Sequence, residues 1–482
     1  MLRPLALSLL LVFSTAATAQ LPAPVAQLMA AARIPEDAIG VLVLRGDTAL
    51  VSHFAERPMQ PASTMKLVTT LVGLEQLGPV FRGRTELRTA GVVTGDILSG
   101  DLVLRGGADA DLTGEVLQTM LQALRNQGIR KIDGRLVLDR HLFNPARTDV
   151  GLAPFDESPD AYYNVIPDAL LVNKNMLLLE MRSNGKSVQI AAQPALDRLT
   201  VESAFTLIEA PCARWEDGWK QPRIERDADG TMHVLLAGTF PKNCTAFNSI
   251  NVVDRQDYVE RLFRAAWKRV GGEFDGPAVE GVAAPDARLL AEHMSRALPE
   301  LVRDINKPSD NALARTLFLS LGSLETDANR GSHPMPGDGP SALRADMVVR
   351  DWLRRKGIND AGLVIDNGSG LSRTERISPL QMGLLLNAGL RSKWAPEFMA
   401  SLPIMGVDGT MRRRLKDSPA FERARMKSGT LRNVTAVAGY VPDANGQQCV
   451  VVAMINFERS SEGKGRAVLD ALIDWVARSN IP

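Results

Sequence analysis

Apolar residues follow the same pattern at both ends of the chain. Residues 39–54 form two β-type runs around a short polar turn, which predicts a hairpin, and residues 434–456 repeat this arrangement. A helix with an apolar face is predicted from about Ser63, and a final helix over 465–478. An antiparallel sheet that takes strands from both chain ends and is backed by helices would bury all four segments.

The middle of the chain has a different pattern of predicted strands and helices. Over 101–244, short strands alternate with turns around one clear helix that starts after Thr113 and stops at Gly128. A second helix is predicted over 258–270, and the chain is mostly helical from Asp286 onward. No internal repeat is visible, so the middle is expected to fold differently from the two ends.

Length and composition describe a large, ordinary globular protein. The 482 residues suggest about three domains, or one large domain with an insertion. Hydrophobic residues make up 45% and charged residues 23%, which excludes a disordered protein. Lys and Arg number 56 against 55 Asp and Glu, and this balance argues against a nucleic-acid-binding protein.

The sequence lacks the common metal-binding and nucleotide-binding motifs. Its five histidines include no HExxH pair, and its three cysteines form no CxxC pair, which argues against a zinc site. A GxxxxGK[ST] phosphate-binding loop and a GxSxG nucleophile elbow are also absent from the sequence. These absences weaken the case for a nucleotide-binding protein and for an α/β-hydrolase.

Residues 1–19 read as a signal peptide. Arg3 supplies the charged start, residues 5–13 form a short apolar stretch, and Ala17 and Ala19 fit the small-x-small cleavage rule. The mature chain would begin at Gln20. Since no later segment reaches 18 apolar residues, we expect an exported, periplasmic protein without a transmembrane segment.

Export makes disulfide bonds possible. Cys212 and Cys244 flank a polar stretch with strand-like pieces, and we expect them to be bridged. Cys449 lies in the apolar run 449–454, which favours a small buried side chain over a reactive thiol.

An SxxK tetrad at the predicted helix start carries the first chemical signal. It places Lys66 one helical turn after Ser63, where a buried lysine can lose its proton and act as the base of the serine. Two further SxxK tetrads, at 183–186 and 461–464, contain glycine and lie in predicted surface turns. Only the tetrad at Ser63 follows a strand pair and enters a hydrophobic helix.

Two more motifs follow later in the chain. Ser309 and Asn311 belong to an SxN motif between two predicted helices, although Ser309 could also be an ordinary helix N-cap and SxN recurs at 249–251. Lys427 opens a K[ST]G triad before the last strand pair, where Gly429 would let a ligand approach the backbone closely. Each of these motifs is weak alone, and the triad could be a strand end without function.

The combination of the three motifs is specific. They appear in the order SxxK, SxN, K[ST]G, which is typical of serine penicillin-binding proteins and β-lactamases. Over nearly the whole mature chain, the sequence resembles the class C low-molecular-mass penicillin-binding proteins of type 4, the D-alanyl-D-alanine carboxypeptidase/endopeptidase family. Residues 100–103, 238–244 and 366–373 share in this resemblance. Two departures are Ser428, where the family usually has threonine, and Asn367, an extra residue within Asp-Gly-Ser-Gly.

The resemblance implies an α+β fold, a penicillin-binding-protein/β-lactamase-type domain of antiparallel sheet packed with helices. Ser63 and Ser309 are 246 positions apart, whereas class A β-lactamases place these motifs only some tens of residues apart. The interval must therefore hold a large insertion, which forms two smaller domains in the family. We expect the catalytic domain at 20–84 plus 281–482, an inserted domain at 85–104 plus 176–280, and a nested domain at 105–175.

The resemblance also implies an acyl-transfer mechanism on a D-Ala-D-Ala bond of peptidoglycan stem peptides. Ser63 would be the nucleophile, Lys66 its base, Ser309 the relay of a proton to the leaving amine, and Asn311 the residue that orients Lys66 and the substrate amide. The substrate carboxylate would be held by Lys427, Ser428 and Thr430. β-Lactams would acylate the same serine, and this mechanism implies no metal and no organic cofactor.

Two charged residues are implied as a side-chain subsite. Arg373 is similar to a family position near the peptide side chain, and Asp149, in the inserted region, could face it. A cation and an anion together would suit the zwitterionic end of a diaminopimelate side chain. The alternative is that both residues are surface charges.

Two alternatives remain open from the sequence. One is a β-lactamase or esterase of the same fold, and the other is a non-catalytic peptidoglycan-binding protein. The length of the insertion disfavours the first, and the presence of all three motifs disfavours the second.

Overall fold

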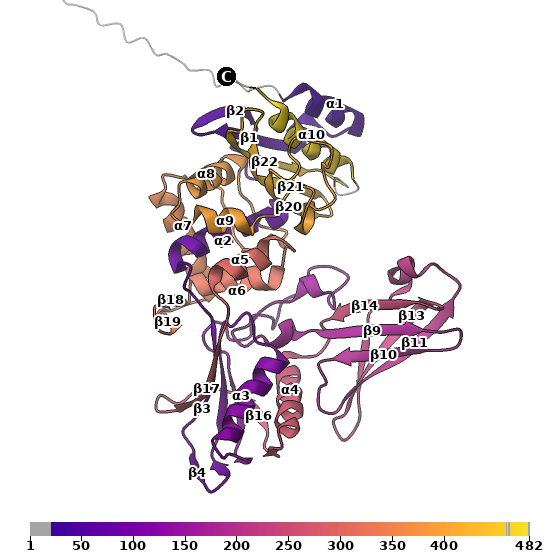
Figure 1. Cartoon of the computed structure of the whole chain (residues 1–482), viewed down its shortest axis with the longest axis vertical. Coiled ribbons are helices and arrows are strands. Elements are labelled where there is room, and N and C mark those ends of the chain that lie inside the picture. Colours follow the sequence, from indigo (N-terminus) through magenta and orange to yellow (C-terminus); the bar gives the residue numbers. More distant parts are fainter. Residues whose placement is uncertain (1–20, 459, 461–462, 481–482) are drawn as a thin grey trace, which may run out of the picture.

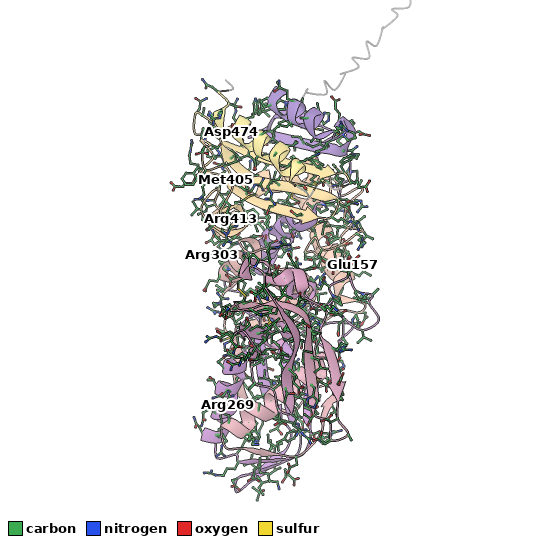
Figure 2. All side chains as sticks on the ribbon, turned by 90° about the vertical axis from the view of Figure 1, so that its right-hand side faces the viewer. Glu157, Arg269, Arg303, Met405, Arg413 and Asp474 are labelled. Atoms are coloured by element: carbon green, nitrogen blue, oxygen red, sulfur yellow. A yellow bond between two sulfur atoms is a disulfide. The ribbon has the colours of Figure 1, made fainter. Side chains whose placement is uncertain are left out.

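The computed structural model describes residues 21–458, 460 and 463–480. The predicted signal peptide 1–19, its cleavage site after Ala19, and Ser461 of the third SxxK tetrad lie outside these residues. Within the described ranges, no helix has the length and apolar character needed to cross a membrane. The molecule is elongated: both chain ends build one half, and the middle of the chain builds the other (Figure 1). Figure 2 shows Asp474 near one end and Arg269 toward the other.

A five-stranded sheet in the order β2-β1-β22-β21-β20 forms the centre of the first half. All its neighbouring strands are antiparallel, and β1 pairs with β22 so that Val41 lies opposite Ala453. The two predicted hairpins therefore join in one sheet. Its strands are β1 (Ile39–Arg45), β2 (Thr48–His53), β20 (Arg425–Leu431), β21 (Val434–Pro442) and β22 (Gln448–Asn456).

Both faces of this sheet are covered by helices. Along β1, Val41 and Val43 pack on the core under the terminal helices, whereas Leu42 and Leu44 pack on the opposite core. This alternation follows from the two-residue repeat of side chains along a strand. The terminal helices are α1 (Ala23–Ala32) and α10 (Lys464–Arg478). The other face bears α2 (Lys66–Leu77), α5 (Leu298–Asn306), α6 (Asn311–Leu321), α7 (Ser341–Arg355), α8 (Pro379–Leu390) and α9 (Ala395–Ser401).

Two mixed sheets begin the second half, and each combines strands from both ends of the insertion. The first has the order β16-β8-β6-β3-β17, and the second β15-β7-β5-β4. Their strands are β3 (Arg84–Thr89), β4 (Val92–Thr94), β5 (Ile97–Ser99), β6 (Leu102–Gly107), β7 (Lys131–Asp133), β8 (Leu136–Asp139), β15 (Glu273–Phe274), β16 (Ala278–Glu280) and β17 (Arg288–Met294). Helices α3 (Gly114–Asn126) and α4 (Arg255–Arg269) pack on one another beside them.

Among the described residues, the named strands between 177 and 250 form ladders only with one another, in the orders β10-β9-β14 and β11-β13-β12, and a single bridge joins Ile250 to Ala161. They extend sideways from the rest of the molecule (Figure 1). Their bounds are β9 (Leu177–Ser183), β10 (Val188–Gln193), β11 (Leu199–Ile208), β12 (Arg223–Arg226), β13 (Met232–Pro241) and β14 (Thr245–Ile250). A small hairpin, β18 (Leu324–Asp327) and β19 (Gly331–Pro334), belongs to neither half's main sheets.

This pairing divides the insertion differently from the expected nested segment 105–175. The first part of that segment contributes β7 and β8 to the two mixed sheets, because β7 pairs with β5 and β15, and β8 pairs with β6 and β16. It also contributes the helix α3. Its second part, 140–175, is irregular chain with two short 3₁₀ helices, η3 (Tyr162–Asn164) and η4 (Val172–Asn175). The self-contained strand set is 177–250. Because β8 is four residues long and its partner β16 lies far along the chain, local sequence carried no signal for this pairing.

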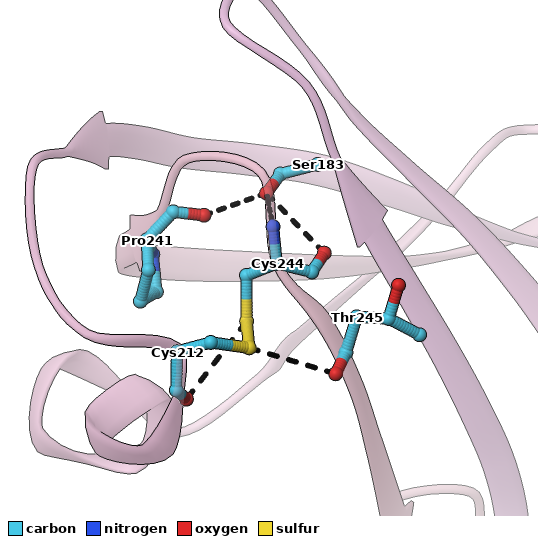
Figure 3. The surroundings of a disulfide bond; sticks show 5 residues. All are labelled: Ser183, Cys212, Pro241, Cys244 and Thr245. Atoms are coloured by element: carbon cyan, nitrogen blue, oxygen red, sulfur yellow. Dashed lines mark hydrogen bonds between the residues drawn. A yellow bond between two sulfur atoms is a disulfide. The ribbon is translucent and has the colours of Figure 1, made fainter.

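A disulfide joins Cys212 to Cys244 within the 177–250 strand set (Figure 3). The Oγ of Ser183, the serine of the second SxxK tetrad, donates to the carbonyl of Pro241 at 2.6 Å and accepts the N–H of Cys244 at 2.9 Å. Its hydroxyl is thus committed to structure. Cys449 is a buried free thiol in the core under the terminal helices.

Candidate active site

The SxxK segment at 63–66 lies between the sheet and the helical core. Residues Ala62–Met65 form a 3₁₀ turn, η2, and Lys66 is the first residue of α2, so the predicted helix begins one turn later than expected. The Nζ of Lys66 lies 3.0 Å from the Oγ of Ser63. The spacing of the tetrad therefore brings base and nucleophile within hydrogen-bond distance.

Lys66 is completely buried and has two further partners. Its Nζ donates to Oδ1 of Asn311 at 2.6 Å and to the carbonyl oxygen of Ser369 at 2.5 Å. Burial, followed by the nearby charge of Lys427, holds the pKa of Lys66 well below its ordinary value. A lysine in this environment gives up its proton more readily than a solvated lysine, and in its neutral form it can accept the proton of Ser63.

Lys427 is the second completely buried lysine of the site. Its Nζ donates to Oγ of Ser309 at 2.8 Å and to the carbonyl of Ser428 at 2.8 Å. Burial lowers the pKa of Lys427 to about 7. The second and third motifs are therefore joined by a direct hydrogen bond between their side chains.

Strand β20 runs against the turn that carries the serine. A Cβ built on Gly429 would lie 2.9 Å from the backbone nitrogen of Ser63 and 2.7 Å from the carbonyl of Pro61. Only glycine fits this approach without displacement. On the neighbouring positions, Ser428 donates its hydroxyl to Oγ1 of Thr410 at 2.7 Å, and Thr430 is exposed.

A tight loop at 366–371 closes the other side of Lys66. The carboxylate of Glu375 accepts the N–H groups of Asn367 at 3.0 Å and Gly368 at 2.8 Å, and this loop presents the carbonyl of Ser369 to Lys66. Glu375 is buried, and burial raises its pKa. Glu375 was not predicted from the sequence, because its role depends on backbone N–H groups that only the folded loop brings to it.

The two residues of the expected subsite lie in different surroundings. Arg373 is exposed, donates to the carbonyl of Phe155 at 2.8 Å, and places its guanidinium 5.1 Å from the centre of the Phe155 ring. Asp149 is paired with Arg147 at 2.9 Å and with Arg255 at 3.4 Å. The structure thus pairs Asp149 with other arginines instead of with Arg373.

Another carboxylate, Asp156, lies beside Phe155. It accepts hydrogen bonds from Nδ2 of Asn164 at 2.8 Å and from the hydroxyl of Tyr163 at 2.9 Å. Although partial burial opposes it, these bonds and the charge of Arg373 together lower the pKa of Asp156. Asp156 was not selected from the sequence, because a single aspartate in a loop has no distinguishing pattern.

The family is decided by a match over almost the whole chain. The sequence profile of the D-Ala-D-Ala carboxypeptidase 3 (S13) family matches residues 21–479. The chain belongs to this family. Membership confirms the predicted resemblance, the α+β penicillin-binding-protein fold, and the predicted class of enzyme, a serine-type D-Ala-D-Ala carboxypeptidase.

Individual relatives of this S13 peptidase agree. It is 27% identical over 403 residues to "D-alanyl-D-alanine carboxypeptidase DacB" of Haemophilus influenzae, covering 83% of this chain and 80% of that protein. It is 28% identical over 423 residues to the "D-alanyl-D-alanine carboxypeptidase" of an Actinomadura species, covering 85% and 76%. The crystal structure of penicillin binding protein 4 from Haemophilus influenzae shares the fold, with a TM-score of 0.76, 24% identity, and coverage of 94% of this chain and 99% of that one.

Proposed function

We propose that this S13 peptidase removes the terminal D-alanine from peptidoglycan stem peptides, and cleaves D,D-crosslinks between them, through an acyl-enzyme on Ser63. The observation that carries the proposal is the buried Lys66, 3.0 Å from the Ser63 hydroxyl and shielded from water. Its lowered pKa gives the serine a base without a histidine or a metal.

In the acylation step, neutral Lys66 takes the proton of Ser63 while Oγ attacks the carbonyl carbon of the D-Ala-D-Ala bond. Asn311 holds Lys66 in place through its Oδ1. The N–H groups of Ser63 and Thr430 stabilise the developing oxyanion, and the close passage of Gly429 along Ser63 favours this pairing. A donor of this kind contributes about 3–4 kcal/mol in comparable enzymes.

The substrate carboxylate and the leaving amine occupy the side of the site formed by β20 and Ser309. Lys427, together with the hydroxyls of Ser428 and Thr430, binds the carboxylate. Ser309, already hydrogen-bonded to Lys427, relays a proton to the leaving D-alanine nitrogen. Water then attacks the acyl-enzyme and releases the shortened peptide.

We also propose export to the periplasm, with cleavage after Ala19. The predicted leader and the Cys212–Cys244 disulfide support this location, because disulfides persist in oxidising compartments. The substrate, peptidoglycan, lies in the same compartment.

Covalent labelling tests the assignment of Ser63. After incubation with benzylpenicillin, intact-mass analysis should show one penicilloyl adduct, and peptide mapping should place it on the peptide that contains Ser63. Ser63→Ala should abolish the adduct. Ser183→Ala is the matched control and should keep it, because that hydroxyl is engaged by Pro241 and Cys244.

Two results would contradict the proposal. An adduct that survives Ser63→Ala, or that maps to Ser183 or Ser461, would assign the nucleophile elsewhere. Rapid release of the penicilloyl group together with no activity on D-Ala-D-Ala peptides would favour the β-lactamase alternative.

A further inference from the structure

A large cavity lies next to the catalytic site but contains none of its motif residues. It has a volume of about 660 Å³. One wall comes from the irregular segment 144–167, another from α6 and the loop 366–371, and a third from the start of α4. This size is that of a pocket for a small molecule or a short peptide. The loop 366–371 separates the cavity from Lys66, to which it presents the Ser369 carbonyl on its other side.

Arg315, on the α6 wall, is a buried cation that forms no direct ion pair with the described residues. Its side chain is 8% exposed. It donates to the carbonyls of Val165 at 2.9 Å and Leu371 at 3.4 Å, while its Nε–H has no partner. Among residues 21–458, 460 and 463–480, no carboxylate lies within ion-pair distance of it. Burial lowers the pKa of Arg315 to about 10, although the more distant charges of Glu375 and Asp366 act in the opposite direction. A buried charge in this state is costly, and a ligand anion would relieve that cost.

The other charges of the cavity are already balanced or hydrated. Arg255 pairs with Asp168 at 3.3 Å and with Asp149 at 3.4 Å, and Arg147 binds Asp149 and Asp254. Asp366 is exposed at the rim, where solvent screens its charge. Arg315 is therefore a buried positive charge of the lining that forms no direct ion pair within the part of the chain that the structure describes.

A second unsatisfied group is of the opposite kind, a hydrogen-bond acceptor. The amide of Asn164 donates through Nδ2 to Asp156 and to the carbonyl of Ser158, which fixes its orientation. Its Oδ1 is buried and receives no hydrogen bond from the described residues. This oxygen is closed off from the cavity, so Asn164 serves the lining as a fixed polar wall. The apolar part of the lining includes Phe155, Ile166 and Phe318, which suits small aliphatic side chains.

We propose that this cavity is a second binding site, separate from the catalytic cleft, for a small carboxylate ligand that pairs with Arg315. The ligand chemistry is a free carboxylate on a small group with aliphatic side chains, which fits the cation of Arg315 and the apolar lining. Two sources carry it, the carboxyl terminus of a peptide and the amino acid released by the reaction. The proposal rests on the proposed function only for the second source.

The test measures ligand binding while the catalytic cleft is blocked. The full mature chain is acylated with benzylpenicillin, and intact mass confirms the adduct. Calorimetry then follows titration with N-acetyl-D-alanyl-D-alanine, with its C-terminal amide, and with free D-alanine. If no adduct forms, the proposed function fails, and the same titrations on the unmodified chain still test the cavity.

We expect saturable binding of the carboxylate peptide and at least about tenfold weaker binding of the amide. Arg315→Gln should weaken binding of the carboxylate peptide by a similar factor, about tenfold. Arg354→Gln, which removes an exposed arginine of α7 outside the cavity, is the matched control and should leave binding unchanged. Affinity for free D-alanine equal to that for the peptide would identify the released product as the source.

Ala342→Trp provides a second variant if Arg315→Gln does not fold. Ala342 lines the cavity at the start of α7, and a tryptophan there would fill part of the volume and abolish binding. The proposal is overturned by the absence of saturable binding, by equal affinity for acid and amide, or by unchanged binding in folded Arg315→Gln. Unchanged binding in Ala342→Trp would place the ligand elsewhere and overturn it as well.

Discussion

At the scale of residues, the site is built around two buried lysines, and burial lowers the pKa of both. Lys66 and Lys427 both have lowered pKa values, and the proximity of Lys427 lowers that of Lys66 further. Their neighbours differ, because Lys66 contacts Ser63 and Asn311 whereas Lys427 contacts Ser309. Lys66 is suited to work neutral, and Lys427 is suited to bind an anion while it is charged.

This difference predicts a bell-shaped pH profile of kcat/KM for a D-Ala-D-Ala peptide. Activity rises as pH increases and Lys66 loses its proton. It falls above about pH 7, because Lys427 loses the charge that binds the substrate carboxylate. In Lys427→Arg the guanidinium stays protonated, so the falling limb should shift to higher pH even where activity is reduced. An unchanged falling limb would show that another group produces it.

Arg373 predicts a selective effect on substrate. Arg373→Ala should lower kcat/KM for a peptide with a free zwitterionic side-chain end. The loss should correspond to about 1–3 kcal/mol of transition-state stabilisation, the range of a lost charge-assisted contact. Acylation by benzylpenicillin should change little. Asp156→Asn should be compared with Asp149→Asn. The charge of Arg373 lowers the pKa of Asp156, whereas Asp149 forms ion pairs with Arg147 and Arg255. Equal losses for both substrates in Arg373→Ala would make Arg373 a structural residue.

At the scale of elements, the site depends on how closely β20 approaches the η2 turn. A Cβ at Gly429 would meet backbone atoms of Pro61 and Ser63 at 2.7 and 2.9 Å, so it cannot be accommodated by rotating a side chain. The strand and the turn therefore form one rigid edge. Any residue larger than glycine must push Ser63 and the end of β20 apart.

Gly429→Ala should lower the acylation rate by about 100-fold, the cost of misplacing reacting groups by roughly 1 Å. Stopped-flow acylation with a chromogenic β-lactam measures this rate. Gly185→Ala is the control, because a Cβ at Gly185 meets no atom within 4 Å. A rate for Gly429→Ala close to that of the control would mean that the approach is not required for catalysis.

The elements also show how far sequence alone could reach. The terminal hairpins and α2 were readable, because their apolar alternation and helical spacing are local properties. The motifs were readable because Ser63 and Lys66 are one turn apart. Glu375 and Asp156 were not, since their importance depends on neighbours that only the folded chain supplies. The strand set 177–250 was also missed, because strand pairing within the insertion is non-local.

At the scale of the whole molecule, the described residues form separate hydrophobic cores. Two cores lie on the two faces of the catalytic sheet, and another fills the inserted half. The disulfide partners Cys212 and Cys244 both belong to the inserted half. Damage there should therefore leave the catalytic sheet intact.

Replacing both cysteines with alanine should lower the free energy of unfolding of the inserted half by about 3 kcal/mol, as expected for a loop of this length. Denaturation followed by tryptophan fluorescence reports on it, because Trp215 and Trp219 pack on the same core. The rate of acylation by benzylpenicillin should be unchanged. A parallel fall in that rate would show that the two halves fold as one unit.

The central sheet joins β1 from the beginning of the chain to β22 from its end, with consequences for timing. Ser63 and Lys66 are synthesised early, whereas Lys427 and Gly429 are among the last residues to leave the ribosome. A chain that stops before β20 carries the nucleophile and its base but neither the anion-binding lysine nor the strand that positions Ser63. Enzymatic competence is thus acquired in a single late event, and incomplete chains remain inert towards the cell wall.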